Sequence, residues 1–202
     1  MTSSYTPIAP EHVVKSENFS DPKVIANYLI QTVPHLFEVI EDKRKTFDQL
    51  WAEYSIGHGM PWDPIRIVQF MYLLDIANAL PEGDYGEFGS HKGLMAKVIY
   101  KLMDPKATMY SFDTFEGFKK QDLKVESKIY THNWTEGNFL PTSPEDVTNY
   151  VGDGNAPTNF KTVQGWFPES FSGYEDKKWR FVHIDFDLYQ PPSRCTSSRR
   201  AS

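Results

Sequence analysis

The stretch that decides the fold runs from Glu82 to Gly93 and reads EGDYGEFGSHKG. The pattern predicts a short strand that ends in an acid, then a tight turn on glycines, then a helix. Gly89 and Gly93 have no Cβ, so the backbone could approach a ligand closely there. Residues 94–103 are strong helix formers with apolar groups at helical spacing. A strand, a glycine turn and a helix N-terminus together form a cradle for a nucleotide-like ligand.

The acid in this turn, Glu87, decides which ligand suits the cradle. A carboxylate would repel a pyrophosphate, but it suits a cationic or hydroxyl-bearing molecule. The full G-x-G-x-x-G pattern of dinucleotide-binding turns is also absent. These two features favour S-adenosylmethionine over NAD. Taken alone, the turn is also compatible with a purely structural strand-to-helix connection.

The chain around this turn predicts an α/β fold. Short β-rich runs alternate with helical or loop segments, which is typical of an open, mostly parallel Rossmann-like sheet. The expected strands are 85–88, 108–112, 160–164 and 180–184, with helices at 94–103 and, more weakly, 143–150. Helices are also expected from Asp21-Pro22, from Pro34 to about Tyr54, and after Asp63-Pro64. We expect an N-terminal arm with helices at 1–58, an incomplete Rossmann-like domain at 59–189 and an unstructured tail at 190–202.

Composition narrows the functional classes. The 202 residues carry a formal net charge of −6, which does not favour a nucleic-acid surface. No apolar run is long enough to span a membrane, and the N-terminus has no apolar core of a signal peptide. The single cysteine, Cys195, cannot form an internal disulfide, which fits a reducing cytoplasm. The sequence therefore predicts a cytoplasmic protein without nucleic-acid or membrane partners.

Three expected strands end in acids, namely Glu87, Asp113 and Asp185. Ligands of parallel sheets bind beyond the carboxyl ends of the strands, so we expect these acids to converge on one crevice. Asp113 follows Glu87 by 26 residues, close to the place where an acid binds ribose hydroxyls in adenosine-binding folds. Each acid alone could instead cap the loop that follows it. The coincidence of three favours a site.

These residues resemble class I S-adenosylmethionine-dependent methyltransferases, in particular the macrocin O-methyltransferase family. Glu87–Gly93 is similar to that family's E-x-G-x-x-x-G cofactor turn, and 112–118 is similar to its F-D-S/T-F-E-G segment. Residues 165–170 resemble its G-W-F segment near the adenine, and 183–189 resemble H-x-D-x-D-L-Y. Gly59-Met60 is similar to a Gly-Met pair that leads toward the cofactor. The likeness extends from about Gly59 to Tyr189.

The resemblance implies O-methylation of a hydroxyl on a sugar or another small molecule, with assistance from a divalent metal such as Mg²⁺. It implies that Asp185 is a metal ligand and Asp187 a candidate general base. Strand residues two apart share a face, so both carboxylates could lie side by side. The implied cofactor-binding residues are Met60, Glu87, Gly89, Ser90, Gly93, Asp113, Thr114, Gly165 and Trp166. Trp166 could stack on adenine or cover the core, and His183 is expected to be packed and hydrogen-bonded within its strand.

The chain departs from the family after Tyr189. The family continues with further strands and an Asp-Asp pair that completes the metal site, whereas residues 190–202 show no periodicity. We therefore expect a C-terminally truncated domain with an incomplete metal site, in which strand 180–184 is an exposed edge. Two alternatives remain: a non-catalytic remnant that binds cofactor or a partner chain, and, less favoured, a nicotinamide-dependent oxidoreductase. The expected partner is a small hydroxyl-bearing acceptor, and association into a homodimer is left open.

Overall fold

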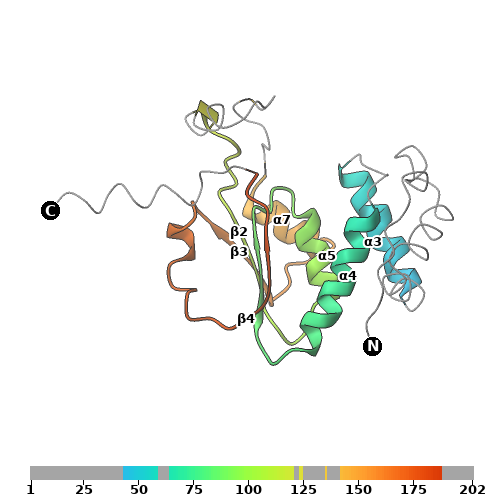
Figure 1. Cartoon of the computed structure of the whole chain (residues 1–202). Helices are drawn as coiled ribbons and strands as arrows, with labels where there is room; N and C mark the ends of the chain where they lie inside the picture. Colours follow the sequence, from blue (N-terminus) through green and yellow to red (C-terminus); the bar gives the residue numbers. More distant parts are fainter. Residues whose placement is uncertain (1–42, 59–63, 121–122, 125–134, 136–141, 188–202) are drawn as a thin grey trace, which may run out of the picture. The chain divides into compact units, whose positions relative to one another are not determined.

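The computed structural model describes residues 43–58, 64–120, 123–124, 135 and 142–187 (Figure 1). The chain divides into two compact units, residues 1–73 and 74–202, and each is described by itself. In the first unit, α3 (Arg44–His58) buries Phe47 and Leu50. Helix α4 (Pro64–Ala79) begins in the first unit, where Ile67 and Met71 are fully buried, and ends in the second.

The second unit is built on a four-stranded parallel sheet of order β3-β2-β1-β4. The strands are β1 (Asp84–Phe88), β2 (Met109–Asp113), β3 (Phe160–Gln164) and β4 (Trp179–Ile184). The order reverses on either side of β1, which makes the unit an open Rossmann-like sheet. The fold class expected from the sequence is confirmed.

Helices cover one face of this sheet, and an aromatic segment covers the other (Figure 1). Helix α5 (Leu94–Leu102) buries Leu94 to Ile99, and α7 (Pro144–Val151) packs against α5 and β3. Helix α7 begins as the sequence predicts, because the Ser143 hydroxyl accepts a hydrogen bond from the Asp146 backbone at 3.0 Å. On the opposite face, a segment that includes the short 3-10 helix η3 (Glu169–Phe171) supplies aromatic side chains.

The aromatic face is a cluster of stacked and edge-on rings. Phe88 and Phe112, on neighbouring strands, stack with ring centroids 4.5 Å apart. Trp179 lies against Gly86, where a Cβ would come within 3.1 Å of the indole ring. The rings that pack on this cluster come from residues 165–186: Phe167, Phe171, Tyr174, Trp179 and Phe186. One face of the sheet is therefore covered by loop side chains instead of a long helix.

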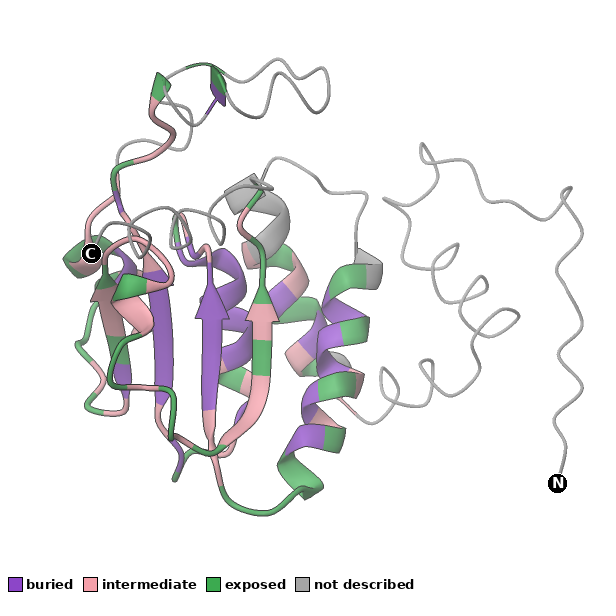
Figure 2. Ribbon diagram, turned by 60° about the vertical axis from the view of Figure 1, so that its left-hand side comes forward, coloured by how far each residue is buried: buried purple, intermediate pink, exposed green. Residues whose placement is uncertain are grey.

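Strand β4 is an edge of the sheet within the described part of the chain, as expected. It is drawn in pink and green over most of its length, whereas β1 is almost wholly purple (Figure 2). Val182 is 40% exposed and Ile184 is 65% exposed. Beside them lies a groove of about 220 Å³, here called the edge groove, whose lining is entirely apolar: Phe88, Phe167, Phe171, Trp179, Val182, Ile184 and Phe186.

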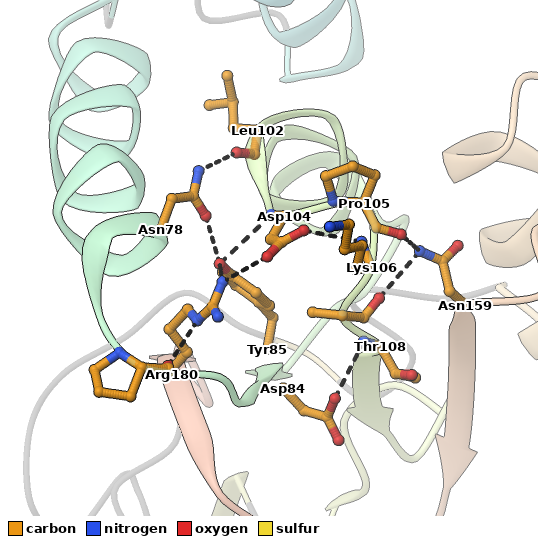
Figure 3. Close-up of polar contacts among 12 residues, drawn as sticks. Asn78, Asp84, Tyr85, Leu102, Asp104, Pro105, Lys106, Thr108, Asn159 and Arg180 are labelled. Carbon is orange, nitrogen blue, oxygen red and sulfur yellow. Dashed lines mark hydrogen bonds and ion pairs between the residues drawn. The ribbon is translucent and has the colours of Figure 1, made fainter.

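A polar network holds the amino ends of the strands (Figure 3). The fully buried Tyr85 donates its hydroxyl to Asn78, and Arg180 donates to the Asp104 carboxylate at 3.0 Å. Arg180 also donates to the carbonyl of Pro81 at 3.1 Å. The backbone N–H of Lys106 and the Arg180 guanidinium hold the pKa of Asp104 below its usual value. This network fastens the end of α4 to β1, β4 and the loop after α5.

Most expected elements that fall within the described residues are present. The strand at 160–164 has the predicted bounds, β1 and β4 each begin one residue earlier, and β2 is shifted by one residue at both ends. The helix expected up to about Tyr54 continues to His58. The helix at 21–29, residues 34–42, Gly59-Met60 and the tail lie outside the described residues. No helix in the described ranges is long and apolar enough to cross a membrane.

Candidate ligand site at the carboxyl ends of the strands

A pocket opens where the four strands end. Each strand contributes its last residues or those that follow it. In chain order, the lining is Gly89 and His91; Phe112, Asp113, Thr114, Gly117 and Phe118; Gly165, Trp166, Phe167 and Ser170; and Asp185, Phe186 and Asp187. Its volume is about 90 Å³. Whole cofactors need about 300–1,000 Å³, so such a ligand would extend beyond this pocket.

Asp113 is held at the pocket by two backbone N–H groups. One of its carboxylate oxygens accepts a hydrogen bond from the backbone N–H of His91 at 2.8 Å, and the other accepts from Phe115 at 2.7 Å. The carboxylate therefore ties the turn after β1 to the loop after β2. Each carboxylate oxygen has a second lone pair, so Asp113 can still accept hydrogen bonds from a ligand.

The turn between β1 and α5 has the strand–turn–helix shape that the sequence predicts. Packing within the protein also requires glycine at two of its positions. Gly89 has a φ of 92°, and a Cβ there would lie 2.0 Å from the carbonyl oxygen of Asp185. Gly93 has a φ of 80°, and a Cβ there would lie 2.9 Å from Val147 on α7. The side on which a Cβ would stand at these two glycines is occupied by the chain after β4 and by α7, while Gly89 still lines the pocket.

Glu87 does not line the pocket. Its side chain is 1% exposed on the helix-covered face, and its Oε1 lies 3.4 Å from His183 Nδ1. Its other oxygen has no hydrogen-bond partner among the described residues. Burial raises the pKa of Glu87, although the contact with His183 partly offsets this effect. His183 is packed within its strand, as expected.

The expected convergence of three acids is wrong for Glu87, and the strand register explains why. Glu87 pairs with Ser111 on β2 and with His183 on β4. Asp113 and Asp185 therefore lie two residues farther toward the carboxyl edge. Ser90 is also buried behind the turn, where its hydroxyl contacts that of Ser111. Of the three acids, Asp113 and Asp185 reach the pocket.

Asp185 and Asp187 follow β4 instead of belonging to it. The strand ends at Ile184, and Asp187 has a φ of 57°, so the alternation that we expected to align the two carboxylates stops before they are reached. Both residues are exposed and line the pocket. No group of three or more histidine, cysteine, aspartate or glutamate residues suited to a metal is found in the described part of the chain. Mg²⁺ requires about six oxygen ligands, so water or further groups would have to complete a magnesium site at these two carboxylates.

Trp166 lies in the pocket wall on the turn after β3. Gly165, with a φ of 145°, makes the turn, and Lys119 places its ammonium group 5.3 Å from the indole centroid. Thr114 and Gly165 also line the pocket, as predicted for cofactor-binding residues, whereas Met60 lies outside the described residues. Our sequence reasoning did not assign Phe118, Ser170 or Phe186 to the site. Their positions directly after the strand-end motifs were the available signal.

The charge of the lining sets the chemistry of this pocket. Three carboxylates, Asp113, Asp185 and Asp187, line it together with four phenylalanines and a tryptophan. Among the described residues, no lysine or arginine lines it. Such a pocket disfavours phosphates and suits a ligand with aromatic, hydroxyl and cationic groups.

Comparisons with known proteins add little beyond the fold. No protein-family model matches the chain, and no curated protein matches it. Among solved structures, the chain is similar to one titled "Crystal Structure of CalS11, Calicheamicin Methyltransferase", with 16% sequence identity and a TM-score of 0.43. The alignment covers 93% of this chain and 72% of that chain. Both measures are low, so the proposal below depends on the residues of the site.

Proposed function

We propose that this chain is an S-adenosylmethionine-dependent methyltransferase that acts on a hydroxyl of a small molecule. The observation that carries the proposal is the pocket at the strand ends, which combines aromatic walls with three carboxylates. S-adenosylmethionine has an adenine ring, two ribose hydroxyls and two cationic centres. Each of these groups has a chemical counterpart in the lining.

Asp113 is the proposed ribose ligand. Its carboxylate ends β2 at the pocket and is held by two backbone N–H groups, so its orientation is set before a ligand arrives. A charged acceptor for two hydroxyls makes stronger hydrogen bonds than a neutral one. Trp166 and Phe118 supply apolar surface for the adenine ring in the same pocket.

The carboxylates after β4 are the proposed acceptor side of the site. S-adenosylmethionine, when bound, would supply an electrophilic methyl group, whose bond to sulfur breaks to leave S-adenosylhomocysteine. Asp187 would accept the proton that the substrate hydroxyl loses as its oxygen bonds to the methyl carbon. Asp185 lies beside it in the lining and would attract a positively polarised ligand group. No step is assigned to Mg²⁺, because the described residues do not provide a sufficient set of ligands.

A panel of cofactors tests the proposal by calorimetry on the full chain. We expect S-adenosylmethionine and S-adenosylhomocysteine to bind, and NAD and ATP to bind much more weakly, because the pocket has carboxylates where phosphates would need cations. Tighter binding of NAD would favour the oxidoreductase alternative. If neither class of cofactor binds, the assignment of the pocket is overturned.

A turnover assay distinguishes an active methyltransferase from a non-catalytic remnant. Transfer of a labelled methyl group to a panel of hydroxyl-bearing acceptors should occur with the wild type and be lost in Asp187→Asn. Cofactor binding should persist in that variant. Binding without transfer to any acceptor in the panel would favour the remnant that only binds cofactor.

A further inference from the structure

One side chain of the strand-end pocket carries a buried polar group that no described residue satisfies. Ser170 lines the pocket, and its hydroxyl oxygen is buried with no hydrogen-bond partner among the described residues. Buried hydroxyls in folded proteins are normally hydrogen-bonded, because water cannot replace a missing partner there. Other polar side chains of the lining have partners: the Thr114 hydroxyl accepts from the backbone N–H of Glu116 at 3.2 Å, and each Asp113 carboxylate oxygen accepts one bond. The Ser170 hydroxyl therefore has hydrogen-bonding capacity that a ligand could use.

The backbone fixes the position of this hydroxyl. The Ser170 N–H donates to the carbonyl of Trp166 at 2.8 Å. A Cβ added to Gly165 would lie 3.1 Å from the Ser170 Cβ, so Ser170 stands directly against the turn that follows β3. The next residue, Phe171, packs its ring against that of Phe112 with centroids 5.8 Å apart, which anchors η3 on the sheet. Ser170 is thus held beside Trp166 before a ligand arrives.

The chemistry of a serine hydroxyl suits the edge of a purine base. Trp166 and Phe118 are the proposed apolar surface for the adenine ring in this pocket. The edge of adenine that carries its amino group has a hydrogen-bond donor, N6, next to an acceptor, N1. A hydroxyl can accept from the first or donate to the second. The ionised carboxylates of the pocket cannot serve N1, because they have no proton to donate.

We propose that Ser170 is a specificity-determining residue of the site, whose hydroxyl hydrogen-bonds to the amino edge of the adenine base. The inference rests on the proposed function, because it takes an adenosine cofactor as the ligand. A bound base supplies the partner that the hydroxyl lacks, so part of the binding free energy comes from satisfying a buried group. A site with such a group discriminates against a ligand that leaves it unpaired.

A comparison of two ligands and two proteins by calorimetry tests this role on the full chain. The ligands are S-adenosylhomocysteine and its analogue with 1-deazapurine in place of adenine, which lacks both the amino group and N1. Ser170→Ala should weaken S-adenosylhomocysteine binding about 3- to 10-fold, as expected for loss of a neutral hydrogen bond. The same variant should leave the affinity for the analogue unchanged. An equal loss for both ligands would mean that Ser170 acts through the structure of the pocket, and this would overturn the proposal.

Stability in the absence of ligand provides a second readout. Ser170→Ala should unfold at the same denaturant concentration as the wild type or at a higher one, because the hydroxyl that it removes has no partner to lose. The control is Ser172→Ala, which removes an exposed hydroxyl two residues later and should change neither stability nor affinity for either ligand. A Ser170→Ala midpoint below those of the wild type and the control would show that the hydroxyl bonds within the protein, which contradicts the proposal.

The role of Ser170 and the proposed function fail in different ways. If the wild type binds S-adenosylhomocysteine and Ser170→Ala binds it equally well, the role of Ser170 is wrong and the proposed function stands. If the wild type binds neither ligand, both are wrong. The wild type alone also gives a test that needs no variant, because equal affinity for the two ligands would show that the amino edge of the base is not recognised.

Discussion

The carboxylates at the two ends of the sheet have different kinds of partner. At the amino end, Asp84 pairs with Lys177 at 3.0 Å and Asp104 pairs with Arg180 at 3.0 Å. At the carboxyl end, Asp113 is held by backbone N–H groups, and the described part of the chain places no lysine or arginine in the lining of the pocket that it shares with Asp185 and Asp187. Acids that are matched by basic side chains hold the fold together. The acids at the carboxyl end line a pocket, where they can contact a ligand.

The largest expected effect tests how tightly the carboxyl end is packed. Gly89→Ala should lower the free energy of unfolding by about 2–5 kcal/mol, because it combines a left-handed backbone with overlap against the Asp185 carbonyl. Gly173→Ala is the matched control, since Gly173 has a φ of 90° but no atom within 4 Å of an added Cβ. It should cost about 1–2 kcal/mol. Equal losses in chemical denaturation would show that the close approach at Gly89 does not matter.

The second prediction concerns the ligand-binding acid. Asp113→Ala should weaken S-adenosylhomocysteine binding by about 10- to 100-fold, which corresponds to losing charged hydrogen bonds worth about 1.5–3 kcal/mol. Asp153→Ala is the control, because that carboxylate pairs with Lys97 at 2.6 Å outside the pocket. Titration calorimetry of both variants gives the comparison. Unchanged affinity in Asp113→Ala would show that this acid does not bind the ligand.

The third prediction tests the amino end. Tyr85→Phe should lower the free energy of unfolding by about 1–3 kcal/mol, because it removes the buried hydroxyl that bonds to Asn78 and lies 3.4 Å from Arg180. Cofactor affinity should stay the same. Tyr174→Phe, on the aromatic face, is the control and should change stability little. A loss of affinity in Tyr85→Phe would mean that the two ends of the sheet are coupled.

The smallest expected effect is a change in the slope of stability with pH. Burial raises the pKa of Glu87 in the folded state, so this state keeps a proton that the unfolded chain releases above about pH 4.3. Stability should therefore fall as pH rises from there to the raised folded pKa, and stay level beyond it. Glu87→Gln should remove this decline in denaturation curves, whereas the exposed Glu82→Gln should not. If the pH dependence of stability of the wild type runs parallel to that of Glu87→Gln, the raised pKa of Glu87 is contradicted.

The sequence predicts the sheet well, because its signals are local. Residues 160–164 are followed directly by a glycine, and Ser143-Pro144 carries its own helix cap, so both elements lie where the pattern places them. The site is predicted less completely. Asp113 reaches the pocket because it is the last residue of β2, but the position of Glu87 depends on its register with Ser111 and His183. Register between distant strands is a property of the packed sheet and cannot be read from one strand's sequence.

The turn of the chain at Asp187 was equally inaccessible to sequence reasoning. Alternation along β4 predicts that Asp185 and Asp187 share a face, but the strand ends at Ile184 and Asp187 takes a left-handed conformation. The aromatic cover of the sheet from residues 165–186 also has no periodic signal. Its rings pack as a cluster that depends on the path of the loop.

The contact at Gly89 also limits how this protein can vary in evolution. A side chain at position 93 would meet the Val147 side chain, so a smaller residue at 147 could make room for it. A side chain at position 89 would meet the backbone carbonyl of residue 185, which every amino acid carries. No substitution at 185 can therefore compensate for the loss of Gly89. Positions 89 and 185 therefore cannot compensate for each other by substitution. Glycine at 89 should persist for as long as the chain after β4 keeps its path.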